Sequence, residues 1–291
     1  MRSKLFVPGA RPELFVKALA GPADAISIDM EDSVIESKKA DVRQTVKTFL
    51  ASPQVAACYK PVIVRCNGIN THHFEDDLSA VLQPNLSMLN LPKIESANDV
   101  LAAVSIIEKV EQENSINNQT LLLINIETPK GLRNVAEISS SHKRVTGLQL
   151  GLNDLFDSSG IARDDMASAH TVMLMVRMAA SEAGIKAYDG AFPDISNMQG
   201  FQAEAEMARR LGYSGKSCIH PNQVESVNRL FVPDLEDVAL AEQIIAAASK
   251  AEGNGVGVFT VEGKMVDFPS ILRAKSVLDE YKRFLDTQNQ A

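Results

Sequence analysis

The chain has 291 residues, of which 45% are hydrophobic and 23% charged, a composition typical of a globular protein with one large domain or two small ones. Its formal net charge is −8 and no basic run is present, which argues against a nucleic-acid-binding protein. The longest apolar stretches, such as Leu121–Ile126, are far shorter than the roughly 20 residues of a membrane-spanning helix, so we expect no membrane association.

The N-terminal segment and the cysteines predict a cytoplasmic protein. Pro8-Gly9 interrupts the apolar N-terminus before a signal-peptide core could form. The three cysteines, Cys58, Cys66 and Cys218, are scattered and odd in number, which argues against disulfides and against a zinc site. If the protein uses a metal, carboxylates are therefore its expected ligands.

Short β-rich runs alternate with longer helical patterns through most of the chain. The expected strands are Lys4–Val7, Ala25–Asp29, Pro61–Cys66, Ser87–Leu91, Leu121–Ile126, Val145–Leu150, Lys186–Tyr188 and Ser217–Ile219. The expected helices are Pro12–Ala20, Lys38–Leu50, Phe74–Leu82, Ala97–Val110, a short helix after Gly131, Asp165–Ala183, Gln199–Arg210 and one that begins near Pro221.

Eight such β–α units predict an α/β protein with a closed (β/α)8 TIM barrel. The strands are almost continuously apolar, which indicates burial on both faces. An open doubly wound sheet is the alternative, but no GxGxxG motif follows the first strand.

The pattern changes after residue 232, where we expect a C-terminal helix–hairpin–helix extension. Leu235–Lys250 is helical in pattern, Gly253–Gly257 is glycine-rich, and Glu262-Gly263 marks a hairpin turn before a last helix from Pro269 to about Leu285. Residues 1–232 then form the catalytic barrel. Residues 233–291 form an extension that is too short to be an independent domain and packs on the barrel or on a neighbouring subunit.

Polar residues gather where the predicted strands end, which is where TIM barrels carry their chemistry. The ends of the second to sixth strands carry Asp29, Glu31, Asp32, Arg65, Asn67, Lys93, Glu95, Glu127, Asn153 and Asp154. Each residue by itself could serve as a helix cap, an ion-pair partner or a turn. Their common position is what indicates an active site.

Glu127 and Asp154 form the strongest candidate pair because they follow consecutive strands. Two carboxylates at neighbouring strand tips can hold one divalent cation, and Mg²⁺ typically takes one or two carboxylates in addition to water and substrate oxygens. Oxygen ligands favour Mg²⁺ or Mn²⁺ over zinc. The alternative is a pair of helix-start carboxylates on a solvated rim.

Arg65, Lys216 and His220 are further candidates for the site. Arg65 suits a substrate carboxylate through its planar fork, or a structural ion pair with Asp29 or Glu31, and the two roles are compatible. Lys216 lies in an eighth-strand segment that often binds phosphate in barrels. His220 precedes Pro221 and fits a turn histidine better than a catalytic one.

Several segments resemble the citrate lyase beta subunit-like group of the HpcH/HpaI aldolase superfamily. They run in order over almost the whole chain and together are highly specific. The segments are Arg2–Gly9, Asp29–Val34, Val64-Arg65, Leu91–Ser96, Ile126–Pro129, Gly151–Leu155, Gly215–Gln223 and Gly257–Pro269. Met30 and Glu262 depart from the commoner residues of the pattern, and neither is a proposed ligand.

The resemblance implies a (β/α)8 barrel that assembles as a homotrimer or a multiple of it, such as a hexamer. It implies Mg²⁺ on Glu127 and Asp154 and a carboxylate on Arg65. It also implies that Asp267, in the C-terminal segment, reaches the active site of a neighbouring subunit as an acid or base. The segment that contains Lys216 is then expected near a coenzyme A or acyl-carrier thioester.

The implied reaction is the Mg²⁺-dependent cleavage, or formation, of a 3-hydroxyacyl thioester such as a citryl, citramalyl or malyl thioester. The products of cleavage are an acetyl thioester and a 2-oxo acid. As an acid, Asp267 needs a raised pKa, which burial at a subunit boundary could supply. The roles of Asp29, Glu31, Asp32 and Lys93 stay unassigned.

Other functions remain open at this point. A metal-dependent pyruvate-type aldolase would need no thioester. A non-catalytic thioester-binding subunit would be expected to lack a metal ligand, yet Glu127 and Asp154 are both present. The sequence does not separate a free-standing lyase that acts on coenzyme A thioesters from a citrate lyase beta subunit that acts on an acyl-carrier protein.

Overall fold

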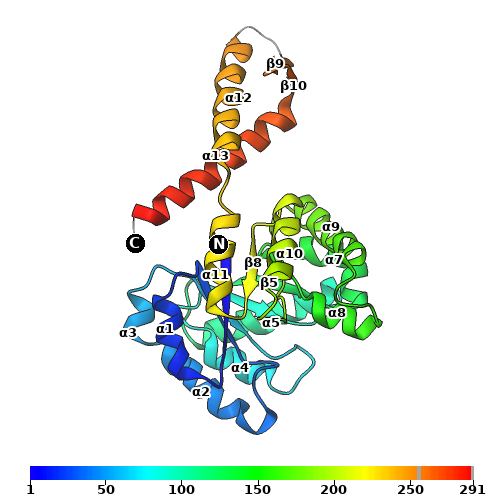
Figure 1. Ribbon diagram of the computed structural model, residues 1–291. Helices are drawn as coiled ribbons and strands as arrows, with labels where there is room; N and C mark the ends of the chain where they lie inside the picture. Colours follow the sequence, from blue (N-terminus) through cyan, green and yellow to red (C-terminus); the bar gives the residue numbers. More distant parts are fainter. Residues whose placement is uncertain (254–256, 290–291) are drawn as a thin grey trace. The chain divides into compact units, whose positions relative to one another are not determined.

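A computed structural model describes residues 1–253 and 257–289, and eight parallel strands form a closed barrel in the described chain (Figure 1). The strands are β1 (Ser3–Pro8), β2 (Ala25–Asp29), β3 (Val62–Arg65), β4 (Met88–Leu91), β5 (Leu121–Ile126), β6 (Val145–Leu150), β7 (Lys186–Asp189) and β8 (Gly215–Cys218). Each strand pairs with the next, and pairing of β1 with β8, with Lys4 opposite Ser217, closes the ring. The predicted (β/α)8 barrel is therefore confirmed.

Helices follow the strands and cover the outside of the barrel. They are α1 (Phe15–Ala20), α2 (Lys39–Leu50), α3 (Pro53–Ala56), α4 (Phe74–Val81), α5 (Ala97–Glu113), α6 (Pro129–Arg133), α7 (Val135–Ser140), α8 (Leu152–Ser159), α9 (Met166–Glu182), α10 (Met198–Arg210) and α11 (Pro221–Leu230). Two 3₁₀ turns, η1 (Pro12–Leu14) and η2 (Glu36–Lys38), precede α1 and α2. Among the described helices, none is long and apolar enough to cross a membrane.

The strands are buried because one face lines the barrel interior and the other lies against the helices. All five residues of β2 are buried, as expected for a parallel strand covered on both sides. Polar side chains cap several of the helices: Ser96 and Asp99 form a capping box at the start of α5, and Thr128 caps α6 through the amide of Gly131. These caps fix where the chain turns after β4 and β5.

The structure adds the helices α3 and α8, which the sequence patterns did not predict. Helix α8 follows β6 directly and buries Leu152, Leu155 and Phe156, and Gly160 ends it in the left-handed region with φ +67°. The prediction assigned only the following helix, α9. Helix α8 is short, and the adjacent polar residues Asn153 and Asp154 near its start resemble a loop in sequence.

A second compact unit begins at Phe231, directly after the first unit, Met1–Leu230. It contains α12 (Leu235–Gly253), the strands β9 (Phe259–Val261) and β10 (Lys264–Val266), and α13 (Phe268–Asn289). The antiparallel hairpin turns at Glu262 and Gly263, both with positive φ, as a tight hairpin turn requires. The predicted helix–hairpin–helix order is confirmed. Of the predicted glycine-rich hinge, residues 254–256 lie outside the described residues.

Candidate active site

The ends of the barrel strands surround a cavity of about 290 Å³. Among its polar lining residues are Asp29, Asp32, Arg65, Glu127 and Asp154. Sequence reasoning predicted Arg65, Glu127 and Asp154 as site residues from separate segments, and the fold brings all three to one cavity. This is the position at which TIM barrels carry their active sites.

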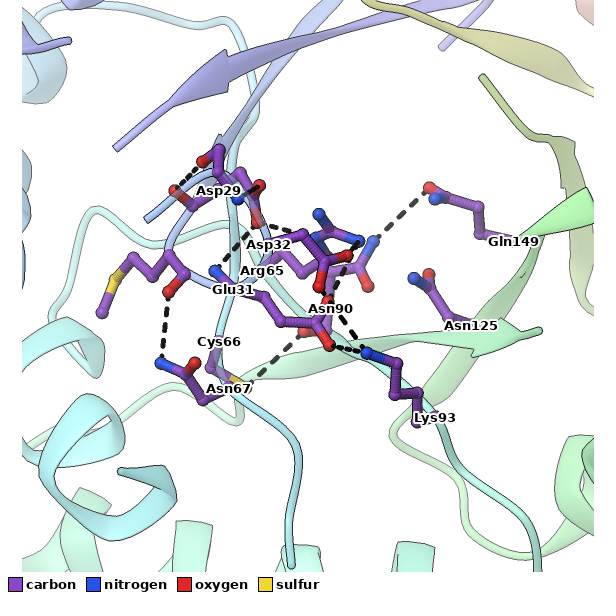
Figure 2. A network of polar contacts seen from close by, with 12 residues as sticks. Asp29, Glu31, Asp32, Arg65, Cys66, Asn67, Asn90, Lys93, Asn125 and Gln149 are labelled. Atoms are coloured by element: carbon purple, nitrogen blue, oxygen red, sulfur yellow. Dashed lines mark hydrogen bonds and ion pairs between the residues drawn. The ribbon is translucent and has the colours of Figure 1, made fainter. Parts of the chain in front are cut away.

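Arg65 ends β3 and is held by three carboxylates (Figure 2). Its Nε lies 2.7 Å from Asp29 Oδ1, and its Nη1 lies 3.0 Å from Glu31 Oε2 and 3.3 Å from Asp32 Oδ2. Burial by itself would lower the pKa of Arg65, but the hydrogen bond to Asp29 and the neighbouring acids raise it. The guanidinium is therefore permanently charged and fixed in orientation, with Nη2 outside these ion pairs.

The acids that hold Arg65 are themselves held. Asp29 accepts backbone hydrogen bonds from Glu31 (3.0 Å) and Ser33 (3.0 Å). Burial would raise the pKa of Asp29, but these bonds and Arg65 keep it below its usual value. Glu31 pairs with Lys93 Nζ at 2.8 Å, and its pKa is raised, mainly by burial. Sequence reasoning predicted Asp29 or Glu31 as an ion-pair partner of Arg65, and Arg65 pairs with both. The pairing of Arg65 with Asp32 and of Lys93 with Glu31 was not predicted, because it joins segments that are distant in the chain.

Glu127 follows β5 and is 2% exposed, so its carboxylate lies inside the protein. Its Oε1 accepts the backbone N–H of Lys93 at 2.7 Å, and its Oε2 accepts Asn125 Nδ2 at 3.1 Å. Lys93 adopts the left-handed region with φ +52°, an uncommon conformation for a side chain that size. Burial, followed by the charges of Glu31 and Asp154, raises the pKa of Glu127 to about 7.

Gly151, between β6 and α8, is required by the close approach of Glu127. A Cβ at this position would lie 2.4 Å from Glu127 Cβ and 2.6 Å from Glu127 Oε2. Backbone without a side chain is therefore the only wall that fits beside this carboxylate. Asp154 follows as the third residue of α8 and is exposed to the cavity that Glu127 lines.

The chemistry of the cavity fits a divalent cation. The pKa of Glu127 is raised by burial and then by neighbouring carboxylates, and a cation would offset both effects. Asn125 also lines the cavity, and its buried Oδ1 has no hydrogen-bond partner among the described residues. The cavity lining within the described chain has oxygen donors but neither histidine nor cysteine, which favours Mg²⁺ or Mn²⁺ over zinc.

Lys216, predicted to contact the substrate, does not reach this cavity. Its side chain is fully buried between β7, β8 and α10, and Nζ donates to Asp189 Oδ2 (2.5 Å), Gly190 O (3.0 Å) and Glu204 Oε1 (2.7 Å). All three ammonium hydrogens are thus engaged. The side chain faces the helix layer, away from the barrel interior, so we omit it from the proposed substrate site.

Asp267, the predicted acid, belongs to the second unit and caps α13. Its Oδ1 accepts the Ser270 amide at 3.1 Å and the Ser270 hydroxyl at 2.7 Å. These bonds lower the pKa of Asp267 in the single chain, which is opposite to the direction that a general acid needs. A raised pKa would have to come from surroundings that one chain does not provide.

Glu36, His72 and His73 form another group whose spacing could suit a metal, because their ligand atoms lie within 4.8 Å of one another. Arg43 Nη2 lies 3.3 Å from His73 Nδ1, and a guanidinium can only donate. Nδ1 must then accept, so Nε2 carries the proton and donates to Glu36 at 2.8 Å. Hydrogen bonds thus occupy both ring nitrogens of His73, which leaves no lone pair to bind a metal.

Comparison with known proteins relates most of the chain to one family. The sequence profile of the HpcH/HpaI aldolase/citrate lyase family matches residues 2–221. The citrate lyase subunit beta of Haemophilus influenzae is 35% identical over 288 residues, covering 97% of each chain. A (3S)-malyl-CoA thioesterase of Cereibacter sphaeroides is 34% identical over 278 residues, covering 95% of this chain and 93% of the relative.

A solved structure is similar as well. The protein CitE from Mycobacterium tuberculosis, in complex with magnesium, acetoacetate and coenzyme A, superimposes with a TM-score of 0.74 at 29% identity. The match covers 97% of this chain and 98% of the other.

Replacement of Gly151 tests the close packing beside Glu127. Gly151→Ala places a Cβ within 2.6 Å of the carboxylate, so we expect a loss of about 1–3 kcal/mol in the free energy of unfolding, measured in urea. Gly68→Ala is the matched control, because a Cβ there would meet only Thr71 at 4.0 Å. Equal stability of the two variants would contradict the packing described here.

The raised pKa of Glu127 predicts a pH dependence of stability in metal-free protein. Because the folded-state pKa of about 7 exceeds the ordinary value of 4.5, protonated Glu127 stabilises the fold at low pH, and this contribution disappears as the pH rises through 7. In a chelator, the free energy of unfolding of wild-type protein relative to Glu127→Gln should fall between pH 5 and pH 8, by on the order of 1–3 kcal/mol. A difference that is independent of pH would refute the raised pKa.

Proposed function

The chain belongs to the HpcH/HpaI aldolase/citrate lyase family and is a lyase, and we propose that it cleaves or forms a 3-hydroxyacyl thioester in a Mg²⁺-dependent reaction. Its products in the cleavage direction are an acetyl thioester and a 2-oxo acid. The observation that carries the proposal is the oxygen-lined cavity with Glu127, Asp154 and Arg65 on its wall. Magnesium and coenzyme A in the related Mycobacterium tuberculosis protein support it.

Glu127 and Asp154 would hold Mg²⁺, or Mn²⁺, with Asn125 Oδ1 as a further oxygen close by. When bound, the ion supplies positive charge that acidifies the substrate hydroxyl group and polarises the oxygen of the 2-oxo acid. Lys93 N–H and Asn125 Nδ2 hold the Glu127 carboxylate in one orientation, so little reorganisation is needed on binding.

Arg65 would bind a substrate carboxylate or the thioester oxygen, on which negative charge accumulates as an enolate forms. Its Nε and Nη1 pair with Asp29 and Glu31, and Nη2 would be the nitrogen that binds the ligand. These two acids do not act on the substrate in this proposal. They keep a buried guanidinium in place before the substrate arrives.

Asp267 of a neighbouring subunit would protonate the acetyl thioester enolate, or remove that proton in the reverse direction. This role requires surroundings that outweigh the bonds to Ser270 and raise the pKa of the carboxyl. A homotrimer or hexamer in which the second unit of one chain closes the site of the next would supply them.

Free, buried Cys66 and Cys218 suit a reducing cytoplasm as the location.

Hydrolysis of a malyl thioester is the second candidate, because a (3S)-malyl-CoA thioesterase is among the relatives at 34% identity. The products separate the two functions. A lyase releases a 2-oxo acid and keeps the acetyl group on its thiol, whereas a thioesterase releases the intact hydroxy acid and the free thiol. Citryl, citramalyl and malyl thioesters of coenzyme A and of acyl-carrier protein are the substrates to compare.

The proposed ligands predict metal-dependent loss of activity. Glu127→Ala and Asp154→Ala should each lower 2-oxo acid formation roughly a hundredfold or more at fixed Mg²⁺. The protein should stay folded, because Asp154 is exposed and burial disfavours the charged carboxylate of Glu127. Asp157→Ala, an exposed acid further along α8, is the control and should retain activity. Activity of the wild-type enzyme after complete chelation would refute the metal requirement.

Replacement of Arg65 tests the need for a planar fork. Arg65→Lys keeps the charge but cannot bind Asp29 and a substrate oxygen together, so kcat/KM should fall roughly tenfold or more. If steady-state kinetics on the best thioester are unchanged, Arg65 is a structural residue only.

Complementation tests whether Asp267 acts between subunits. Asp267→Asn and Glu127→Ala should each be inactive. Mixed and reassembled oligomers should regain part of the activity, because some sites then combine both wild-type residues. If Asp267 acts within its own chain, no mixed site is complete and activity stays absent. Full activity of Asp267→Asn by itself would remove this residue from the mechanism.

A further inference from the structure

The start of α8 carries the proposed ligand Asp154, yet no side chain caps it. The capping position is Gly151, which has no side chain to accept a hydrogen bond from the first turn. Some helices of the described barrel, such as α5 with Ser96, are capped by a side chain, whereas α1, α2, α4 and α7 are not. At α8 a capping side chain is excluded by the site itself, because any Cβ at Gly151 would collide with Glu127. The first turn of α8 is instead held by a side chain from outside the helix.

Arg163 provides that fixation from the other end of the helix. After α8 the chain reverses at Gly160, so Arg163 returns to the first turn. Its Nε donates to Asn153 Oδ1 at 2.5 Å, and Asn153 Nδ2 donates to Ala191 O at 3.3 Å. The Asn153 side chain, next to Asp154, is thus held by Arg163 and by Ala191. Asn153 and Ala191 also line the cavity.

Arg163 is in turn anchored to a buried network of charges. Its Nη1 lies 2.7 Å from Glu204 Oε2 on α10, and the other oxygen of Glu204 accepts Lys216 Nζ at 2.7 Å. Lys216 also pairs with Asp189, at the end of β7. Two cations and two anions balance, and Glu204 and Lys216 are each only 1% exposed. Such a network is costly to break at any member, which makes it a rigid support.

We propose that Arg163 is a positioning residue that connects this network to the first turn of α8 and so fixes Asp154 for metal binding. The inference rests on the proposed Mg²⁺ site and assigns it a support that starts at β7 and β8. It also gives Lys216 a structural role, as the central cation of the support. Residues that orient metal ligands in this way typically change metal affinity by 10–100-fold when replaced.

The test uses Mg²⁺ by itself as the probe and the melting temperature of the full chain as the readout. Wild-type protein, Arg163→Met and Arg163→Lys are titrated with Mg²⁺, and the concentration at half of the maximal shift is compared. Arg163→Met should need at least tenfold more Mg²⁺ and should melt lower without metal. Arg163→Lys can still pair with Glu204 but cannot also hold Asn153, so it should recover the melting temperature without recovering Mg²⁺ affinity.

Asn153→Ala keeps the charge network and removes the hydrogen bonds of Asn153 to Arg163 and to Ala191, so it protects the test if Arg163→Met fails to fold. It should weaken Mg²⁺ binding. If the double variant Arg163→Lys/Asn153→Ala folds, its Mg²⁺ affinity should be no lower than that of the weaker-binding single variant. Arg177→Met is the control, because Arg177 also makes a tertiary hydrogen bond through Nε, to the backbone carbonyl of Gly212, and neither residue lines the cavity. It should leave the Mg²⁺ midpoint unchanged.

Two results would overturn the inference while leaving the metal site intact. One is a wild-type Mg²⁺ midpoint in Arg163→Lys and Asn153→Ala, and the other is additive losses in the double variant. If wild-type protein itself shows no Mg²⁺-dependent shift, the proposed metal site fails and the positioning role fails with it.

Discussion

The burial of one carboxylate, Glu127, is the constraint on which the rest of the site depends. A carboxylate removed from water must receive hydrogen bonds, and here Asn125 and the backbone of Lys93 donate them. The Lys93 amide reaches it in a left-handed conformation, and the wall opposite must be a glycine, Gly151. Local strain and an uncapped helix thus follow from one buried acid. They concentrate where parallel strands end and backbone geometry can still vary.

Charged side chains form two separate networks, one at the mouth of the barrel and one outside its wall. At its mouth, Asp29, Glu31 and Asp32 surround Arg65, and Lys93 pairs with Glu31 from the next strand (Figure 2). Outside the barrel wall, Lys216 joins Asp189 and Glu204. The first network fixes a cation that faces the cavity. The second holds secondary structure elements together and, through Arg163, reaches the first turn of α8. Arg65 and Lys216 therefore have different roles in spite of their equal charge, since the planar guanidinium of Arg65 can bind acids and a ligand at once.

Sequence patterns were sufficient for the architecture because each element carries its own signal. The strands are short apolar runs, and a polar residue follows most of them, so eight repeats in order predicted a barrel and a common edge for Arg65, Glu127 and Asp154. Helix α8 was missed because eight residues with two polar positions near the start give too weak a periodicity. The role of Lys216 was missed for another reason. A strand buried on both faces has no polar alternation to show which side chain points inward.

The sequence by itself determined the order of the elements, the edge at which the polar residues gather and the oxygen character of any metal ligands. Local periodicity and residue chemistry are written along the chain, so no distant contact is needed to recognise them. Only the tertiary structure decided which acids hold Arg65, why Gly151 must be a glycine and how Arg163 reaches Asn153. These are distances between segments far apart in sequence, and they exist only after the barrel has closed.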